Sequence, residues 1–430
     1  MTTKNPPAKS ARAVALDFLQ TVLHGKKPLD LALADHPALD SRDRAFARAL
    51  VATTFRRLGQ IDSLIDTALE RPLPRKAKGV RDILRLGACQ LLFMGAAPHA
   101  AVSTAVDLAQ ARGHGPHKKL VNAILRRFSR EGRALTDKQN AARMNTPDWL
   151  WQSWSAAYGE TTCQNIAEAH LSEAPLDITA PNNTAEWAET LEAEILPTGT
   201  LRRGAGGLVP ELPGFKDGAW WVQDAAAALP VKFFGDVQGK SVIDLCAAPG
   251  GKTAQLAAAG ARVTAVDRSE KRLARVRENL DRLNLEADLV SADGVEWRPD
   301  APADAVLVDA PCSSTGTIRR HPDVARLKTP GDVAKLAGLQ QRLLAAAVEM
   351  VRPGGLIVYC SCSLQPEEGL GQTASLLDDG APVVCSPISP EEIGRHGELL
   401  TEIGELRTLP NHLSDRGGMD GFYAVRFKRL

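Results

Sequence analysis

From about residue 235 to the end of the chain, short apolar runs alternate with stretches of helical periodicity, which restricts the possible folds. Helical stretches such as Glu270–Leu283 and Val333–Val351 separate several of the apolar runs. Strands that alternate with helices are typical of a parallel, doubly wound sheet covered on both faces, a Rossmann-like α/β fold. In such sheets ligands bind beyond the carboxyl ends of the strands, so we expect the functional residues there. The runs with strand character are Ser241–Cys246, Arg262–Val266, Ala287–Ser291, Ala305–Val308 and Leu356–Cys360.

The first 140 residues have a different pattern and a different charge. Apolar residues recur at helical spacing, as in Leu58, Ile61 and Ile65, and β-alternation is absent, which predicts an all-α bundle. This part holds 24 Lys and Arg against 12 Asp and Glu, a net charge of +12, whereas the whole chain has a net charge of only +1. The asymmetry indicates a polyanionic partner, with nucleic acid the leading candidate. A solvated, Arg-rich helical surface without a partner is the alternative.

The length and composition of the chain limit the number and the type of its domains. With 430 residues the chain is long enough for two or three domains, and we expect a helical domain at 1–138, a small mixed α/β connector at 139–222 and an α/β domain at 223–430. No apolar run approaches the roughly 18 residues of a membrane span. Seven cysteines without a repeating spacing do not form a disulfide framework, so we expect reduced thiols in a cytoplasmic protein. No obligate protein partner is evident, and we expect a monomer.

A glycine-rich turn follows the first predicted strand. The segment Asp244–Thr253 reads DLCAAPGGKT, and its two glycines let a ligand approach the backbone in front of a helix N-terminus. A phosphate-binding loop would need glycine where Cys246 stands, and the G-x-G-x-x-G dinucleotide fingerprint is absent. A nucleotide-like ligand without phosphates fits better, and S-adenosylmethionine is the common one; a turn with no ligand is the alternative. The candidate cofactor-binding residues are Cys246, Ala247, Ala248, Pro249, Gly250, Gly251 and Lys252.

Two aspartates follow the next two predicted strands. Asp267 is placed to accept hydrogen bonds from ribose hydroxyls, about twenty residues after the loop. Asp293 could accept a hydrogen bond from an adenine amino group. Taken singly, each could instead be a solvated strand end or a helix cap. Their matched positions beside the glycine-rich turn favour a role in binding the cofactor.

Two thiols follow the last two predicted strands. The fourth strand leads to Asp309 and Cys312, and the fifth leads to Cys362. Two cysteines without further ligands at suitable spacing make a poor zinc site, so we expect no metal. Nucleophilic catalysis is the remaining interpretation, with Lys252 the nearest cation that could lower a thiol pKa. We interpret Cys89, Cys163 and Cys385 as buried apolar residues, Cys360 as strand packing and Cys246 as part of the loop backbone.

These motifs resemble those of a known family. Residues 220–430 are similar to the Nop/Sun family of RNA cytosine-5 methyltransferases in DLCAAPGGK, in DAPCS (309–313), in RRHPD (319–323), in Cys362–Ser363 followed by PEE (366–368), and in MDGF (419–422). Residues 1–135 resemble the NusB-like RNA-binding bundle, notably Asp43–Leu64 and Lys119–Phe128. The combination is similar to the bacterial members of the family that act on 16S ribosomal RNA.

The resemblance implies a function and a set of roles. The substrate would be a cytosine in RNA, methylated at C5 with S-adenosylmethionine bound by the loop, Asp267 and Asp293. Cys362 would attack C6 of the base, Asp309 and the Pro311 carbonyl would bind its polar edge, and Cys312 would act in product release. Spacing by itself leaves open which thiol attacks, because the Pro-Cys motif also resembles the attacking cysteine of DNA cytosine methyltransferases.

The target base must leave its stack, so single-stranded or looped ribosomal RNA is the expected partner. The alternatives are the same chemistry on transfer RNA or 23S ribosomal RNA, transfer to a protein side chain, and a non-catalytic RNA-binding or assembly factor.

Overall fold

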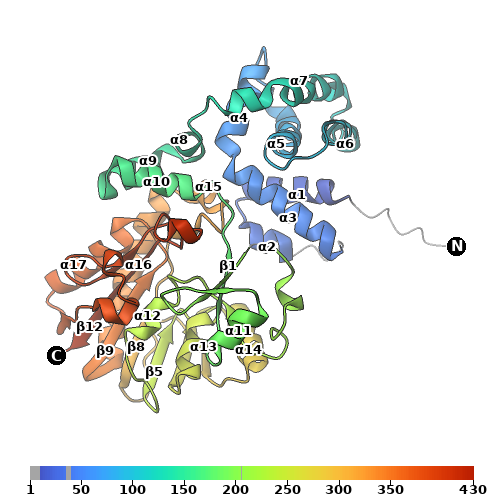
Figure 1. Ribbon diagram of the computed structural model, residues 1–430. Coiled ribbons are helices and arrows are strands. Elements are labelled where there is room, and N and C mark those ends of the chain that lie inside the picture. Colours follow the sequence, from blue (N-terminus) through green and yellow to red (C-terminus); the bar gives the residue numbers. More distant parts are fainter. Residues whose placement is uncertain (1–9, 35–39, 205) are drawn as a thin grey trace. The chain divides into compact units, whose positions relative to one another are not determined.

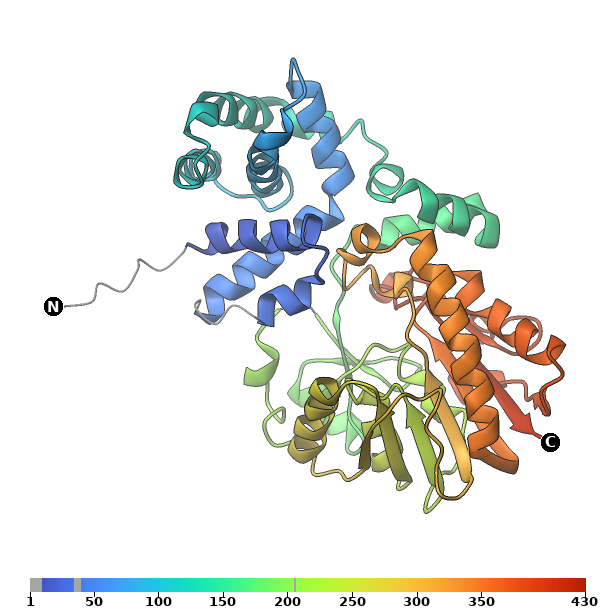
Figure 2. The ribbon, with the colours of Figure 1, turned by 180° about the vertical axis from the view of Figure 1, so that it is seen from behind.

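The computed structural model describes residues 10–34, 40–204 and 206–430. Internal contacts divide the chain into two units. One comprises Met1–Leu171 together with His321–Lys328, and the other comprises Ser172–Arg320 and Thr329–Leu430. Figures 1 and 2 show the two units in opposite views, coloured along the sequence.

The first unit is helical, as predicted. Its apolar core is formed by residues such as Leu16, Leu50, Val80 and Leu125, which are fully or almost fully buried. The side chain of Ser10 accepts a hydrogen bond from Ala13 N–H and caps the first helix. The helices are α1 (Ala11–Leu23), α2 (Leu29–Ala34), α3 (Ser41–Arg56), α4 (Leu58–Ala68), α5 (Lys78–Leu92), α6 (Pro98–Ala111), α7 (Lys118–Thr136), α8 (Ala141–Asn145), α9 (Asp148–Tyr158) and α10 (Glu160–Ala169).

A segment from much later in the chain completes this unit. It contains the short helix α15 (Val324–Leu327). The buried Asp323 carboxylate accepts a hydrogen bond of 2.9 Å from Leu29 N–H, and Nδ1 of His321 lies 3.1 Å from Asp30 Oδ2. The Arg326 guanidinium donates to the Asn145 carbonyl at 2.9 Å. Half of the RRHPD motif therefore packs with the helices.

The second unit begins with a small antiparallel sheet in the order β2-β3-β1-β4. Its strands are β1 (Leu176–Thr179), β2 (Glu194–Ile195), β3 (Leu201–Arg203) and β4 (Trp221–Val222), with α11 (Thr184–Thr190) between β1 and β2. Ile178, Leu191, Leu201 and Trp220 form its core. The helices at 141–169, which the sequence analysis assigned to the connector, belong to the helical unit, and the small sheet belongs to the second unit. Whether three segments fold independently stays a prediction.

The main sheet of this unit has the strand order β10-β12-β9-β8-β5-β6-β7, and β11 pairs with β12. The pairs β5–β6, β6–β7, β5–β8 and β8–β9 are parallel, whereas β12 runs antiparallel to β9. The predicted doubly wound, mostly parallel sheet is confirmed. The strands are β5 (Ser241–Leu245), β6 (Arg262–Asp267), β7 (Asp288–Ser291), β8 (Ala303–Asp309), β9 (Val351–Ser361), β10 (Val383–Cys385), β11 (Leu406–Thr408) and β12 (Phe422–Arg429).

Helices cover both faces of the main sheet. On one face Val242 and Leu307 pack with α12 (Leu229–Lys232) and α13 (Gly251–Ala258). On the other face their strand neighbours Ile243 and Val306 pack with α16 (Pro330–Met350) and α17 (Leu370–Asp378). This alternation is the period-2 pattern of a sheet buried on both sides. The helix after β6 is α14 (Glu270–Leu283), with the predicted bounds.

The strand order reverses between β5 and β8, which lie side by side although α13, β6, α14 and β7 separate them in sequence. The carboxyl ends of these strands carry the glycine-rich turn and the first cysteine motif. This is the point at which a doubly wound sheet binds its ligands. In the described part of the chain, we find no helix whose length and apolar character would allow it to span a membrane.

Candidate active site

The two predicted thiols meet at the carboxyl edge of the sheet. Cys312 follows β8 and Cys362 follows β9, and their Sγ atoms lie 3.4 Å apart. Both cysteines are partly exposed and both are free thiols, since a disulfide requires about 2.05 Å between the sulfurs. The Gly316 N–H donates to the Cys362 carbonyl at 3.0 Å, which ties the two cysteine-bearing loops together.

Lys252 connects the glycine-rich turn to the end of β8. Its Nζ lies 2.7 Å from Asp309 Oδ2 and 5.1 Å from the centre of the Phe422 ring. Burial lowers the pKa of Lys252, but the charges of Asp309, Cys360 and Cys362 and the hydrogen bond to Asp309 together raise that pKa above the ordinary value. Lys252 is therefore a permanent cation beside the first cysteine motif.

The surroundings distinguish the two thiols electrostatically. The pKa of Cys362 is lowered, first by the hydrogen bond from the Cys312 thiol and further by Lys252, against the effects of burial and of Asp309. The pKa of Cys312 is raised well above the ordinary value by the same hydrogen bond, by burial and by the Glu368 charge. The hydrogen bond between the thiols therefore acts in opposite directions on the two pKa values. The arrangement favours a thiolate at Cys362.

The remaining cysteines differ from this pair. Cys89, Cys163 and Cys360 are buried, as expected for apolar packing. Cys385 is only partly buried, so its interpretation as a buried residue is wrong: it lies at the end of β10, which borders the sheet. Cys246 is in the left-handed region (φ 64°) within the loop, and burial raises its pKa to about 12.

The glycine-rich turn leaves the start of α13 open to a ligand. Gly250 has a φ of 100°, where a β-carbon would be strained, and that atom would lie 3.0 Å from Val276. No side chain caps the helix behind it. Asp244, near the end of β5, is fully buried. Its Oδ2 accepts a hydrogen bond from the Thr253 hydroxyl at 2.6 Å, whereas its Oδ1 has no hydrogen-bond partner among the described residues. Burial raises the pKa of Asp244 to about 7.

The two predicted cofactor aspartates lie at the ends of neighbouring strands but differ in exposure. Asp267, at the end of β6, is buried, and it accepts hydrogen bonds from Ser269 N–H at 3.0 Å and Ala248 N–H at 3.4 Å. It therefore also braces the glycine-rich turn. Asp293, after β7, is exposed, and its Oδ1 accepts from Val295 N–H at 2.9 Å.

Sequence reasoning missed charged and polar groups that surround the cysteines. Arg320 is held by Asp420 of the MDGF motif and, like Lys252, has a pKa raised by nearby negative groups that include Cys362, although burial acts against this. Glu368 is fully buried and binds groups in both cysteine-bearing loops. Arg320 lies in the RRHPD segment and Glu368 in the PEE segment, but the local sequence does not indicate which residues they contact.

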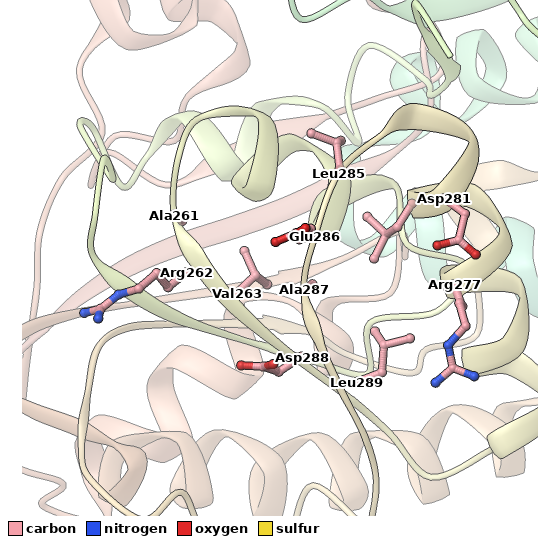
Figure 3. A pocket seen from close by; sticks show the side chains of 11 residues that line it. Ala261, Arg262, Val263, Arg277, Asp281, Leu285, Glu286, Ala287, Asp288 and Leu289 are labelled. Carbon is pink, nitrogen blue, oxygen red and sulfur yellow. The ribbon is translucent and has the colours of Figure 1, made fainter. Parts of the chain in front are cut away.

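A second concave surface of this unit lies at the opposite edge of the sheet. Its volume is about 630 Å³, and Figure 3 shows Arg262, Glu286 and Asp288 among the side chains that line it. Arg262 and Asp288 are the first residues of β6 and β7, whereas the site residues follow the last residues of the strands. Among the described residues, no group of three or more His, Cys, Asp or Glu side chains is arranged to hold a metal ion.

Comparison with known proteins agrees with this geometry. The family model described as 16S rRNA methyltransferase RsmB/F matches residues 234–428, and the NusB family model matches residues 9–130. A curated protein of Shigella boydii serotype 4, "Ribosomal RNA small subunit methyltransferase B", is 34% identical over 90% of this chain and 94% of its own length. The protein of the same name from Vibrio cholerae is 34% identical over 96% of both chains.

Solved structures share the fold. The structure titled "Crystal Structure of PH0851" covers 100% of both chains with a TM-score of 0.77 and 21% identity. A methyltransferase homolog protein from Pyrococcus horikoshii covers 65% of this chain and 94% of its own, with a TM-score of 0.54 and 26% identity.

Proposed function

Because the chain belongs to the 16S rRNA methyltransferase RsmB/F family, we propose that it transfers a methyl group from S-adenosylmethionine to C5 of a cytosine in 16S ribosomal RNA. The observation that carries this proposal is the 3.4 Å separation of the Cys312 and Cys362 sulfurs beside Lys252 and Asp309. A paired thiol and thiolate suit a reaction that forms and then breaks a covalent bond to the base.

In the proposed reaction, the Cys362 thiolate adds to C6 of the cytosine, and the electron pair of the 5,6 double bond moves toward C5 and N3. Asp309 and the Pro311 carbonyl bind the polar edge of the base and favour protonation at N3. The carbanion-like C5 then takes the methyl group. Loss of the C5 proton to a base restores the double bond and expels Cys362 as a thiolate. The Cys312 thiol, 3.4 Å away, acts in this release step.

The residues around the glycine-rich turn fit a nucleoside-type methyl donor. S-adenosylmethionine supplies a methyl group on a positively charged sulfur, from which it transfers readily to a carbon nucleophile. The missing side chain at Gly250 and the uncapped start of α13 leave room and N–H donors, and no phosphate-binding glycine pattern is present. The segment Cys246–Lys252 would hold the donor together with Asp267 and Asp293. Oδ1 of the buried Asp244 is an acceptor that has no hydrogen-bond partner among the described residues.

The experiment is methyl transfer from labelled S-adenosylmethionine to purified 16S ribosomal RNA, followed by nucleoside mass spectrometry. The proposal expects labelled 5-methylcytosine. Parallel reactions with transfer RNA and 23S ribosomal RNA test the other substrates, and label in those pools alone would contradict the proposed one. Tight RNA binding with no methyl transfer to any pool would indicate a binding or assembly factor instead. We also propose that the protein acts as a monomer in the cytoplasm, and sedimentation of the purified protein tests the monomer.

A further inference from the structure

The exposed basic residues of the helical unit lie on several helices, and α7 carries four of them. Arg81 and Arg85, which belong to a basic cluster in the sequence, are paired internally with Asp62, Asp66 and Asp82. Carboxylates of the same unit therefore already neutralise these two guanidiniums. On α7, by contrast, Lys119, Arg126, Arg130 and Arg133 are exposed, and among the described residues none of the four has a carboxylate within ion-pair distance.

A groove of about 310 Å³ runs between α6 and α7 beside this row. Asn122, Arg126, Ser129 and Arg130 line it from α7 at the spacing of one helical face, and His99 and Ser103 line it from α6, together with Pro98 and Val102. No acidic residue lines it. The nearby acids are engaged or point elsewhere: Glu131 pairs with Arg127 at 3.1 Å, and Asp107 of α6 is outside the lining.

We propose that this α6–α7 groove binds the phosphodiester backbone of the RNA substrate. The inference rests on the proposed function, because it assigns RNA as the ligand. The Arg126 guanidinium, whose Nε donates to Asn122 Oδ1 at 3.1 Å, and the Arg130 guanidinium lack a carboxylate partner among the described residues. Together with the nearby amide and hydroxyl donors they suit phosphate oxygens, which guanidinium binds in a bidentate geometry. Of the described side chains that line the groove, only the His99 imidazole could stack on a base, so we assign the groove to positioning the RNA backbone.

The test compares RNA binding by the full-length protein and its Arg126→Ala/Arg130→Ala variant, with a transcript of 16S ribosomal RNA and a range of salt concentrations. Each neutralised phosphate of a single strand contributes about 0.7 to the slope of log K against log salt, so the slope should fall by about 1.4. Arg126→Lys/Arg130→Lys should retain the slope. The matched control, Arg262→Ala/Arg277→Ala, removes two guanidiniums from the other concave surface.

An equal loss in the control, or an unchanged slope in the groove variant, would overturn the assignment. So would binding of polyglutamate to the wild type as tightly as RNA, which would indicate an acidic protein partner. Failure of the proposed function is distinguishable, since a wild-type protein that binds RNA with a normal salt slope but transfers no methyl group leaves the groove assignment standing.

A second inference comes from the buried Glu368 carboxylate. Its Oε1 accepts hydrogen bonds from Ser313 N–H at 2.8 Å and from Gln340 Nε2 at 3.2 Å, and its Oε2 accepts from the hydroxyls of Ser313 and of Ser363, the latter at 2.5 Å. Ser313 follows Cys312, and Ser363 follows Cys362. One side chain therefore holds the residues next to both thiols.

The same network reaches the carbonyl proposed to bind the base. Gln340 Nε2 donates at 2.9 Å to the Pro311 carbonyl, and the Tyr359 hydroxyl donates to Gln340 Oε1 at 3.2 Å. The single proton of the Tyr359 hydroxyl is shared between Gln340 Oε1 and the Glu368 carbonyl, 3.0 Å from the Tyr359 oxygen, and the Ser361 hydroxyl donates to the same carbonyl at 2.8 Å. A fully satisfied buried network of this kind is rigid, because each group that moves leaves a partner unpaired.

We infer that Glu368 is a positioning residue that keeps the two cysteine-bearing loops, and through Gln340 the Pro311 carbonyl, in register for the proposed reaction. Glu368→Gln can keep every bond, since its amide oxygen accepts from Ser313 N–H and Gln340 while its amide NH₂ donates to the two hydroxyls. Glu368→Ala leaves four donors without this acceptor.

Glu368→Ala should lower kcat at least tenfold with KM for RNA and for S-adenosylmethionine unchanged, whereas Glu368→Gln should stay within about threefold of the wild type. Thr373→Val is the matched control, because it removes the buried 2.6 Å hydrogen bond between Thr373 and the Tyr423 hydroxyl without touching either cysteine-bearing loop. It should lose stability and keep kcat.

A readout independent of methyl transfer is the rate at which diamide oxidises Cys312 and Cys362 to a disulfide, with the azo group reduced to a hydrazine. That rate should fall in Glu368→Ala and persist in Glu368→Gln. If Glu368→Ala does not fold, Ser363→Ala serves in its place. Wild-type kcat and oxidation rate in the alanine variant would overturn the inference, and a wild type that oxidises readily but never methylates RNA would overturn only the proposed function.

Discussion

Lys252 Nζ, on the first turn of α13, lies 2.7 Å from Asp309 Oδ2 at the end of β8. This ion pair joins the turn proposed to hold the methyl donor with the carboxylate proposed to bind the base. The two residues are 57 positions apart in sequence, and they come together because β5 and β8 are paired in parallel. The pair also places a buried cation in the field of Cys362.

Removal of that cation should move the pH dependence of thiol attack. The pKa of Cys362 is lowered in the folded protein, so its thiolate persists to lower pH than an ordinary thiolate. Lys252→Met withdraws one of the stabilising groups, and the pH profile of adduct formation should shift upward by about one unit. Lys240→Met, an exposed lysine bound to the Asp236 carbonyl, is the control and should leave the profile in place. A downward shift for Lys252→Met would contradict the electrostatic account.

The two cysteines should behave differently on RNA that contains 5-fluorocytosine, which blocks loss of the C5 substituent and traps the adduct. Cys362→Ala should form no covalent complex, because the nucleophile is gone. Cys312→Ala should still form it, and with ordinary RNA it should accumulate the adduct because release is slow. Denaturing gel electrophoresis of labelled RNA measures both. An adduct in Cys362→Ala and none in Cys312→Ala would reverse the assignment.

Gly316 is predicted to tolerate no side chain. A β-carbon there would lie 1.8 Å from the Gly421 carbonyl oxygen, and both residues are fixed by a backbone hydrogen bond of 2.9 Å from Gly421 N–H to Gly316 O. Gly316→Ala must therefore displace the Cys312 loop, and adduct formation should fall at least a hundredfold. Gly338→Ala is the control: it lies on the exposed side of α16 with nothing within 4 Å of the added carbon. It should raise the free energy of unfolding by about 0.5–1 kcal/mol and keep activity. Full activity in Gly316→Ala would show that the loop can move without loss.

A buried ion pair anchors the small sheet within the second unit. Arg202 of β3 makes two 2.7 Å hydrogen bonds to Asp177 of β1 and also donates to the Gly418 carbonyl at 2.6 Å. Arg202→Ala leaves the buried Asp177 without its countercharge. It should lower the free energy of unfolding, measured by chemical denaturation, by about 3–5 kcal/mol. Arg298→Ala breaks the solvent-exposed pair with Glu349 and should cost about 1 kcal/mol or less. Similar losses of unfolding free energy in the two variants would mean that burial does not determine how much the Arg202–Asp177 pair stabilises the protein.

The sequence by itself determined the five parallel strands of the main sheet, several of its helices and the edge of the sheet that carries the site. The predicted run Arg262–Val266 lies within β6, and the predicted helix Glu270–Leu283 is α14, because apolar periodicity is a local property that the chain expresses wherever it packs. Once the strands were known to be parallel, the residues after each strand had to share one edge. That argument placed Asp309, Cys312 and Cys362 together without any distance.

Tertiary structure decided which side chains are partners. The 3.4 Å between the two sulfurs, the attachment of Glu368 to both cysteine-bearing loops and the packing of Asp323 with Leu29 join residues that are distant in sequence. So does the internal pairing of Arg85 with Asp62, which removes it from the exposed charge of the helical unit. Local pattern carries no record of such pairs, since hydrogen bonds and charges act over a few ångströms in space and only the folded chain brings their groups that close.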